Sequence, residues 1–246
     1  MTAACNHARD EKSRKAVILF DVDGTLLITG GATTRCIWRA AEATFNRTLD
    51  RCPLTAGLLD PELFLGIARH NRIDNAESEL DRYTRRYLIE LEKELDATRE
   101  AVKVMPGVLA ILEELQNSPG VATGILTGNF RAATDLKLRA AGLHRFSFPA
   151  SAFGEDAPDR AALVSTALSN YERLTGERLT PPHAIIVGDT PRDVAAARSA
   201  GCKVLSVATG AYTLSKLDAE KPDAAVANLL DPRPLRRLIQ EVTSCP

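Results

Sequence analysis

Lys15-Ala-Val-Ile-Leu-Phe20 runs directly into Asp21-Val-Asp-Gly-Thr25, and this stretch decides the fold. Its apolar residues do not alternate with polar ones, which indicates a strand that is covered on both faces, as in a parallel sheet. Two carboxylates follow at the C-terminal end of this strand. The stretch therefore predicts an α/β protein with acidic side chains at one edge of its sheet.

From about residue 103 onwards, short apolar strands alternate with helical patterns. Right-handed crossovers in such a pattern bring the C-terminal ends of parallel strands to one edge, where open α/β sheets carry their active sites. We therefore predict a doubly wound, Rossmann-like parallel sheet. Its strands are expected at Val121–Leu126, Ala184–Val187 and Val204–Val207, and two of its helices at Arg131–Ala141 and Arg160–Leu174.

The segment between residues 29 and 102 has helical patterns and no convincing strand. Its clearest helix is predicted over Asn75–Ala97, where apolar residues recur every three or four positions. Because both flanks are α/β, this segment is predicted to be an inserted module. The predicted domains are a catalytic core of residues 1–28 and 103–246 and a helical cap of residues 29–102.

Several cap residues have two possible roles. Gly30-Gly31 is either a hinge or a turn. Trp38, Tyr83 and Tyr87 are expected in the cap core rather than in a stacking platform. The cationic candidates for contact with an anionic substrate tail, each of them also a candidate surface residue, are Arg35, Arg39, Arg69, His70 and Arg72.

Composition excludes several classes of protein. The chain has 246 residues, of which 45% are apolar and 26% charged, with a formal net charge of −1. This apolar content argues against general disorder, and the balanced charge without a long basic run argues against nucleic-acid binding. Apolar runs reach only about six residues, so no membrane span is expected. The sequence does not specify an oligomeric state.

The N-terminus and the cysteines bear on the compartment. Met1 to Lys15 has no apolar core of a secretory signal, and the five cysteines are scattered without a CxxC pair. Neither a disulfide framework nor a zinc site is indicated, so the cytosol is the expected compartment.

Asp21 and Asp23 form the first of three polar clusters expected at the sheet edge. Their carboxylates point the same way, so each disfavours ionisation of the other unless a cation lies between them. Mg²⁺ suits this place because it takes hard oxygen ligands and keeps waters that a phosphate displaces. A calcium loop is excluded because its twelfth position would be Ala32 instead of Glu. The alternative is an Asp-rich turn that closes a strand.

The second cluster, Thr127-Gly128-Asn129, stands between a strand and a helix. A hydroxyl, a flexible glycine and exposed helix amides make a natural anion cradle. Alternatively, Asn129 only caps the helix.

The third cluster is Gly188-Asp189-Thr190-Pro191-Arg192-Asp193. Thr190 suits the N-cap of a helix, Pro191 its first position, and Asp193 a capping interaction. Asp189 ends a strand expected beside the one that carries Asp21, so a third carboxylate strengthens the case for a metal.

A phosphate also needs a cation beside it. Arg160 begins the helix that precedes the Asp189 strand, and its guanidinium suits bidentate contact with phosphate oxygens. The alternative is a solvated residue at a helix start. Lys137 is the second candidate for this cationic role.

Taken together and in this order, these residues resemble the haloacid dehalogenase (HAD) superfamily. The DxDGT motif matches Asp21 to Thr25, the Thr or Ser motif matches Thr127, the Lys or Arg motif is best matched by Arg160, and the GDxxxD motif matches Gly188 to Asp193. The insertion resembles the C1 cap of the phosphoglycolate phosphatase and β-phosphoglucomutase subgroup. Many relatives with this cap carry Lys in a Lys-Pro context, whereas this chain has Arg160 after Ala-Pro-Asp.

The resemblance implies a Mg²⁺-dependent phosphatase that acts on a small phosphorylated metabolite. Asp21 would form an aspartyl-phosphate, and Asp23 would serve as general acid and base. The metal would be held by Asp21, the Asp23 backbone carbonyl and Asp189, with Asp193 farther out or acting through water. The phosphoryl group would be bound by Thr127, Gly128, Asn129 and Arg160.

Other activities of the superfamily are also considered. A phosphomutase of the β-phosphoglucomutase type, or a catalytically silent binding protein on the same fold, are the alternatives. A dehalogenase is disfavoured because such members lack the second carboxylate, here Asp23. A phosphonate hydrolase needs a cap lysine, for which this chain offers only Lys93 and, at the border, Lys103.

Overall fold

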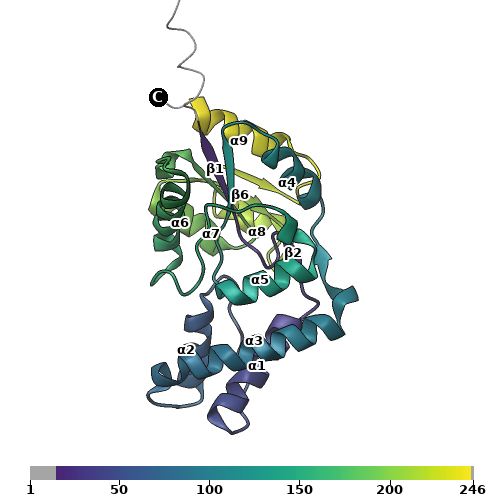
Figure 1. Ribbon diagram of the computed structural model, residues 1–246, viewed down its shortest axis with the longest axis vertical. Helices are drawn as coiled ribbons and strands as arrows, with labels where there is room; N and C mark the ends of the chain where they lie inside the picture. Colours follow the sequence, from purple (N-terminus) through teal and green to yellow (C-terminus); the bar gives the residue numbers. More distant parts are fainter. Residues whose placement is uncertain (1–14, 245–246) are drawn as a thin grey trace, which may run out of the picture.

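The computed structural model describes residues 15–244, and its core is a five-stranded parallel sheet (Figure 1). The strands are ordered β4-β1-β5-β6-β7. They span β1 (Ala16–Phe20), β4 (Val121–Ile125), β5 (Ala184–Gly188), β6 (Lys203–Val207) and β7 (Ala224–Val226). The predicted doubly wound α/β fold is confirmed.

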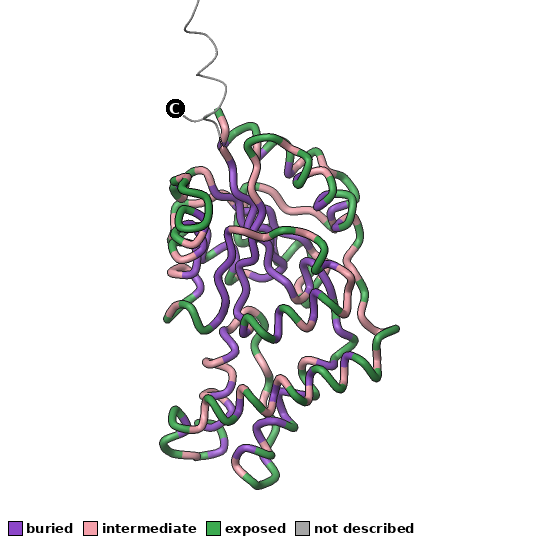
Figure 2. The backbone as a smooth tube through the Cα atoms, viewed as in Figure 1, coloured by how far each residue is buried: buried purple, intermediate pink, exposed green. Residues whose placement is uncertain are grey.

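Strand β1 lies between β4 and β5 in this sheet and is buried along its whole length (Figure 2). Successive side chains of a strand point to opposite faces. Ile18 and Phe20 accordingly pack into one hydrophobic cluster, and Val17 and Leu19 pack into another. Both faces need apolar residues, which explains the uninterrupted apolar run.

Helices cover both faces of the sheet. On one face, α4 (Val108–Gln116) and α9 (Arg233–Ser244) pack with Ile18 and Phe20. On the other, α6 (Arg160–Thr175) and α7 (Pro191–Ala200) pack with Val17 and Leu19. The remaining core helices are α5 (Arg131–Ala140) and the short α8 (Leu214–Ala219), with single turns at Leu143–Arg145 and Pro181–His183.

A separate helical lobe lies beyond the carboxyl edge of the sheet (Figure 1). It contains α1 (Ala32–Phe45), α2 (Asp60–His70) and α3 (Leu80–Ala97), with a turn at Arg99–Ala101. An antiparallel ribbon of β2 (Leu27–Ile28) and β3 (Lys103–Val104) joins the chain segments that enter and leave it. The ribbon lies next to the borders chosen from the sequence, although the domain boundaries stay a prediction.

The helix predicted over Asn75–Ala97 is divided. Asn75 has a left-handed backbone with φ of 55°, and Ala76–Glu79 forms a 3₁₀ turn before α3 begins at Leu80. Asn75 therefore lies before the first turn, and the apolar pattern runs through a 3₁₀ turn into an α-helix without a left-handed residue between them.

The helical lobe has a core of stacked aromatic rings. Ring centroids lie 5.3 Å apart for Phe45 and Phe64, 4.2 Å for Phe64 and Tyr83, and 5.9 Å for Tyr83 and Tyr87. Trp38 is also buried. These three predicted cap-core residues, Trp38, Tyr83 and Tyr87, are therefore confirmed as packing residues.

Within residues 15–244, the structure contains no helix that is both long and apolar enough to cross a bilayer. Cys36, Cys52 and Cys202 are free thiols. Cys5, Cys245 and nearly all of the segment examined for a secretory signal lie outside the described residues.

Candidate active site

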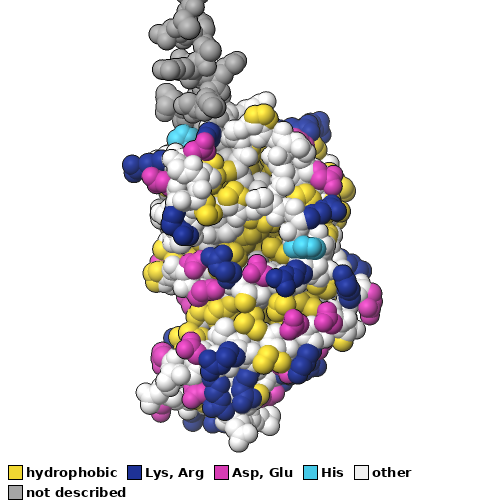
Figure 3. Space-filling view, viewed as in Figure 1, with side chains coloured by type: hydrophobic (Ala, Val, Ile, Leu, Met, Phe, Trp, Pro, Cys, Tyr) yellow, Lys and Arg dark blue, Asp and Glu magenta, His cyan; other side chains and the backbone are white. Residues whose placement is uncertain are grey.

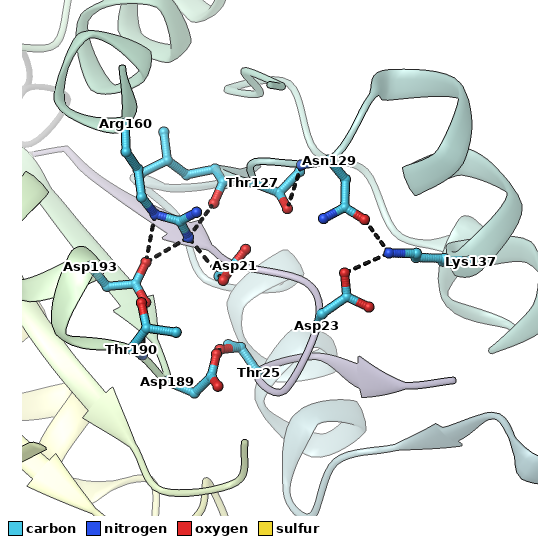
Figure 4. Close-up of polar contacts among 11 residues, drawn as sticks. Asp21, Asp23, Thr25, Thr127, Asn129, Lys137, Arg160, Asp189, Thr190 and Asp193 are labelled. Carbon is cyan, nitrogen blue, oxygen red and sulfur yellow. Dashed lines mark hydrogen bonds and ion pairs between the residues drawn. The ribbon is translucent and has the colours of Figure 1, made fainter. Parts of the chain in front are cut away.

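The three polar clusters meet where β1, β4 and β5 end (Figure 4). Phe20 at the end of β1 is paired with Ile125 of β4 and with Val187 of β5. This register brings the residues that follow these strands to the same edge. Asp21, Thr127 and Asp189 thus lie together, as the strand pattern predicts.

Three buried carboxylates form a candidate metal site. Ligand oxygens of Asp21, Asp189 and Asp193 lie within 4.8 Å of one another. Burial raises the pKa of Asp21 to about 6, although Arg160 opposes the shift. Burial and the nearby Asp21 raise the pKa of Asp189 to about 8. A divalent cation would favour their ionised forms, and this all-oxygen set fits Mg²⁺.

Two glycines make room for the Asp189 carboxylate. A Cβ atom on Gly24 or on Gly210 would overlap the Asp189 side chain. Gly24 also has a positive φ of 84°, which L side chains rarely adopt. The Thr25 hydroxyl donates a hydrogen bond of 3.1 Å to Asp189 Oδ1. The DxDGT spacing therefore serves the packing of the carboxylates as well as their chemistry.

Arg160 lies inside the site, at the first position of α6. Its Nη2 is 2.8 Å from Asp21 Oδ2 and 2.6 Å from Asp193 Oδ1. Burial opposes the charge, but Asp193 and Asp21 raise the pKa of Arg160 above its usual value. The alternative of a solvated residue at a helix start is thus wrong. Asp159 caps α6, with its Oδ1 accepting from the Ala162 N–H at 2.8 Å.

Asp193 uses both of its oxygens within the protein. Oδ1 accepts from Arg160, while Oδ2 accepts from the Thr190 N–H at 2.9 Å and from the Thr190 hydroxyl at 2.8 Å. Thr190 is the N-cap of α7 and Pro191 its first residue, which confirms the predicted capping interaction. Because both oxygens are engaged, Asp193 is better placed to hold Arg160 than to bind a metal directly.

Asp23 lies apart from the three clustered carboxylates and faces Lys137 (Figure 4). Lys137 Nζ is 2.5 Å from Asp23 Oδ2 and also donates to Asn129 Oδ1. The lysine side chain is fully buried on α5, whereas the Asp23 side chain is 37% exposed. Lys137 therefore neutralises Asp23, while Arg160 lies beside Asp21. One sequence signal points to this contact. Lys137 lies on the inward face of a predicted helix, where the other residues are small or apolar.

Asp60 is a buried carboxylate that was not among the site residues predicted from the sequence. Its Oδ2 accepts from the Phe130 N–H at 2.9 Å, and its own N–H donates to the Gly128 carbonyl at 2.7 Å. These bonds join the start of α2 to the loop that carries Thr127 and Asn129. Burial raises the pKa of Asp60 to about 7, although Lys137 opposes the shift. In sequence, an Asp before Pro resembles an ordinary helix start.

A cavity of about 400 Å³ separates this edge from the helical lobe. Its wall includes Asp21, Asp23, Asn129 and Arg160, together with the loop that precedes α2. The view in Figure 3 shows hydrophobic side chains along the junction of the two lobes, between charged residues on either side.

The fold and the site define an α/β enzyme with a carboxylate centre at the edge of a parallel sheet, beneath a helical lobe. The chain belongs to the haloacid dehalogenase-like hydrolase family, whose sequence profile matches residues 18–207. The resemblance inferred from the four motifs is thereby confirmed, and the protein is a hydrolase of this family.

Relatives support this assignment over nearly the whole chain. Pyrophosphatase PpaX from Bacillus velezensis is 30% identical over 227 residues, covering 89% of this chain and 94% of that protein. CbbY from Rhodobacter sphaeroides, solved with phosphate, superposes with a TM-score of 0.71 at 20% identity, covering 88% of this chain and 96% of its own. A hydrolase from Pseudomonas syringae gives a TM-score of 0.68 at 17% identity, covering 92% and 99%. The two solved structures establish the likeness of the fold.

Proposed function

We propose that the protein is a Mg²⁺-dependent phosphatase that hydrolyses a small phosphorylated metabolite. The observation that carries this proposal is the buried Asp21 carboxylate, which lies 2.8 Å from Arg160 and faces a cavity. A carboxylate next to a fixed guanidinium can attack phosphorus while the cation binds phosphoryl oxygens. The pyrophosphatase name of the Bacillus velezensis relative supports phosphoryl chemistry.

The two aspartates would divide the reaction between them. Asp21 attacks phosphorus, so that an aspartyl–phosphorus bond forms while the bond to the leaving oxygen breaks. Asp23 donates its proton to that oxygen. It then takes a proton from the water that attacks the aspartyl-phosphate, which releases phosphate and restores Asp21. The partial exposure of Asp23 supports this role because the group must exchange protons.

Other residues would bind and orient the phosphoryl group. The amides of the Thr127–Asn129 loop precede α5, and the N-terminal end of a helix favours an anion. Arg160 is held by Asp193, which fixes the plane of its guanidinium. Lys137 holds Asp23 and Asn129 at the other side of the cavity.

A bound Mg²⁺ would be held by Asp21, Asp189 and the Asp23 backbone carbonyl, with Asp193 behind them. It would supply positive charge between the carboxylate and phosphoryl oxygens, which otherwise repel. The support for this is the buried three-carboxylate cluster, in which the pKa values of Asp21 and Asp189 are raised.

Substrate size and compartment belong to the same proposal. A cavity of about 400 Å³ lies in the lower part of the range for small-molecule sites, which supports a small metabolite. The free thiols of Cys36, Cys52 and Cys202 support the cytosol as the compartment.

The test is a panel of phosphorylated metabolites incubated with the full chain and Mg²⁺, scored for inorganic phosphate and for isomers. We expect phosphate release that stops with EDTA or with Asp21→Asn, while Asp218→Asn, an exposed control, retains activity. Isomer formation without phosphate would favour the mutase alternative. Binding without any turnover would favour the silent alternative, and full activity of Asp21→Asn would overturn the mechanism.

A further inference from the structure

The cavity walls beyond the phosphoryl site are apolar or hydroxylic. Ile37 of α1 and Leu63 of α2 contribute side chains, as do Leu54 and Thr55 of the loop before α2. Thr34 adds a further residue of this type. Such walls favour burial of a carbon skeleton and can exchange hydrogen bonds with neutral hydroxyl groups.

Carboxylates outnumber cations among the residues that line the cavity. Three carboxylates line it, those of Asp21, Asp23 and Asp60, whereas Arg160 is the single Lys or Arg among the described residues of its wall. Arg160 is already bound to Asp21 and Asp193, at the place where the transferred phosphoryl group would lie. A second anionic group on the substrate would therefore meet carboxylates without a counter-ion of its own.

Three of the cations near the cavity already have partners. Arg35 and Arg39, which the sequence offered for contact with an anionic tail, both donate to Glu94, at 2.7 and 2.6 Å, and Arg35 also donates to the Gly30 carbonyl at 3.1 Å. Lys137 is held by Asp23 and Asn129. To reach the cavity, each of these side chains would have to break its present hydrogen bonds.

We propose that the leaving group of the substrate is neutral, an alcohol with an apolar or hydroxylated skeleton and no second phosphate or carboxylate. This inference rests on the proposed phosphatase function and narrows its substrate class. Such a substrate differs from pyrophosphate, which is the substrate that the name of the Bacillus velezensis relative indicates for that protein.

The test compares esters that differ in one charge. 2-Hydroxyethyl phosphate and phosphoglycolate differ only in a terminal alcohol against a carboxylate, and phenyl and 4-carboxyphenyl phosphate form a second pair. We expect kcat/KM for the neutral member of each pair to exceed that of the charged member by at least ~100-fold, which corresponds to about 2.7 kcal/mol. Inorganic pyrophosphate should be as poor as the charged esters.

A single added cation at the cavity wall should weaken this preference. Thr55 is exposed at the cavity wall, so Thr55→Lys adds an ammonium group there without burying it. We expect it to raise the ratio of kcat/KM for phosphoglycolate over 2-hydroxyethyl phosphate by about tenfold, the effect of 1.4 kcal/mol. Thr48→Lys adds the same charge at an exposed position outside the cavity wall and should leave the ratio unchanged.

The outcomes separate this inference from the proposed function. If the neutral and charged esters are hydrolysed within tenfold of each other, the neutral-leaving-group inference is overturned while the phosphatase function stands. An equal shift of the ratio in Thr55→Lys and Thr48→Lys would also overturn it. If no ester is hydrolysed, the phosphatase function fails, and the inference fails with it.

Discussion

At the scale of single residues, the site is organised around two buried cations with different partners. Arg160 binds Asp21 and Asp193, and Lys137 binds Asp23 and Asn129. Each proposed reacting carboxylate thus has its own counter-ion. A buried charge that loses its partner is costly, so these pairs should resist substitution.

Replacing Lys137 should impair the reaction more than the fold of the sheet. Lys137→Met keeps most of the length of the buried side chain but leaves Asp23 and Asn129 without their shared donor. We expect kcat to fall about 10- to 100-fold, because Asp23, the proposed general acid, is no longer held in place. Steady-state kinetics with phenyl phosphate measure this. The exposed Arg139→Gln on the same helix is the control, and an equal loss in both variants would contradict the assignment.

Asp189 should be needed for the response to the metal. At a hundredfold excess over its Kd, a ligand that binds only the folded state stabilises it by about 2.7 kcal/mol. We therefore expect Mg²⁺ to raise the wild-type melting temperature by about 5 °C or more, and Asp189→Asn to lose this shift. Calorimetry with and without Mg²⁺ provides the measurement. An unchanged shift in Asp189→Asn would place the metal elsewhere.

At the scale of elements, the loop of residues 127–130 is packed against the start of α2. A Cβ on Gly128 would overlap the Leu58 carbonyl, so Gly128→Ala should push the helical lobe away from the loop. We expect kcat/KM to fall by about 100-fold, because the loop amides that are proposed to bind phosphate would be displaced. Gly66→Ala in α2 has no such neighbour and should retain activity. Normal kinetics of Gly128→Ala would contradict this contact.

The contact between α2 and this loop should also depend on pH through Asp60. Its pKa is raised from 3.8 to about 7 in the folded state, so the unfolded chain binds fewer protons between these values. Stability from this group is present at low pH and is lost as the pH rises towards 7. Asp60→Asn keeps an acceptor for the Phe130 N–H and does not titrate.

We therefore expect the free energy of unfolding of the wild type to fall by about 1–3 kcal/mol relative to Asp60→Asn between pH 5 and pH 8. Urea unfolding at the two pH values measures the difference. Asp21 and Asp189 titrate in both proteins, so their effects cancel in the comparison. Parallel pH dependence of the two proteins would mean that Asp60 does not titrate in this range.

The parts of this arrangement that could be predicted from sequence are those with a local cause. The apolar run of β1 and the capping residues Thr190 and Pro191 act within a few positions, and all appear as expected. The ribbon of β2 and β3 has only two residues in each strand, too few for a recognisable alternation.

The contacts missed from sequence are long-range ones. Lys137 and Asp23 are 114 positions apart, and Asp60 and Phe130 are 70 apart. Each contact depends on how a helix packs over the sheet edge, which no local pattern specifies. Arg160 was predicted as a site residue because the order of the motifs identified it. Its contact with Asp21 was not predicted from the sequence.

At the scale of the whole molecule, the two lobes have different tasks. The sheet lobe carries the groups that would act on the phosphoryl group, and the helical lobe supplies most of the neutral wall that would meet the rest of the substrate. Specificity is therefore expected to change with substitutions in α1, α2 and the loop before α2, without change to the carboxylate centre.

The central claim is that Asp21 becomes phosphorylated during turnover, and acid quenching of the working enzyme tests it most directly. The full chain, mixed rapidly with phenyl phosphate and Mg²⁺, is quenched in acid, digested and analysed by mass spectrometry. The account predicts one phosphoryl group on the peptide that contains Asp21, which Asp21→Asn lacks. Phosphate release in a single turnover with no phosphorylated Asp21, or with the label on another residue, would contradict it.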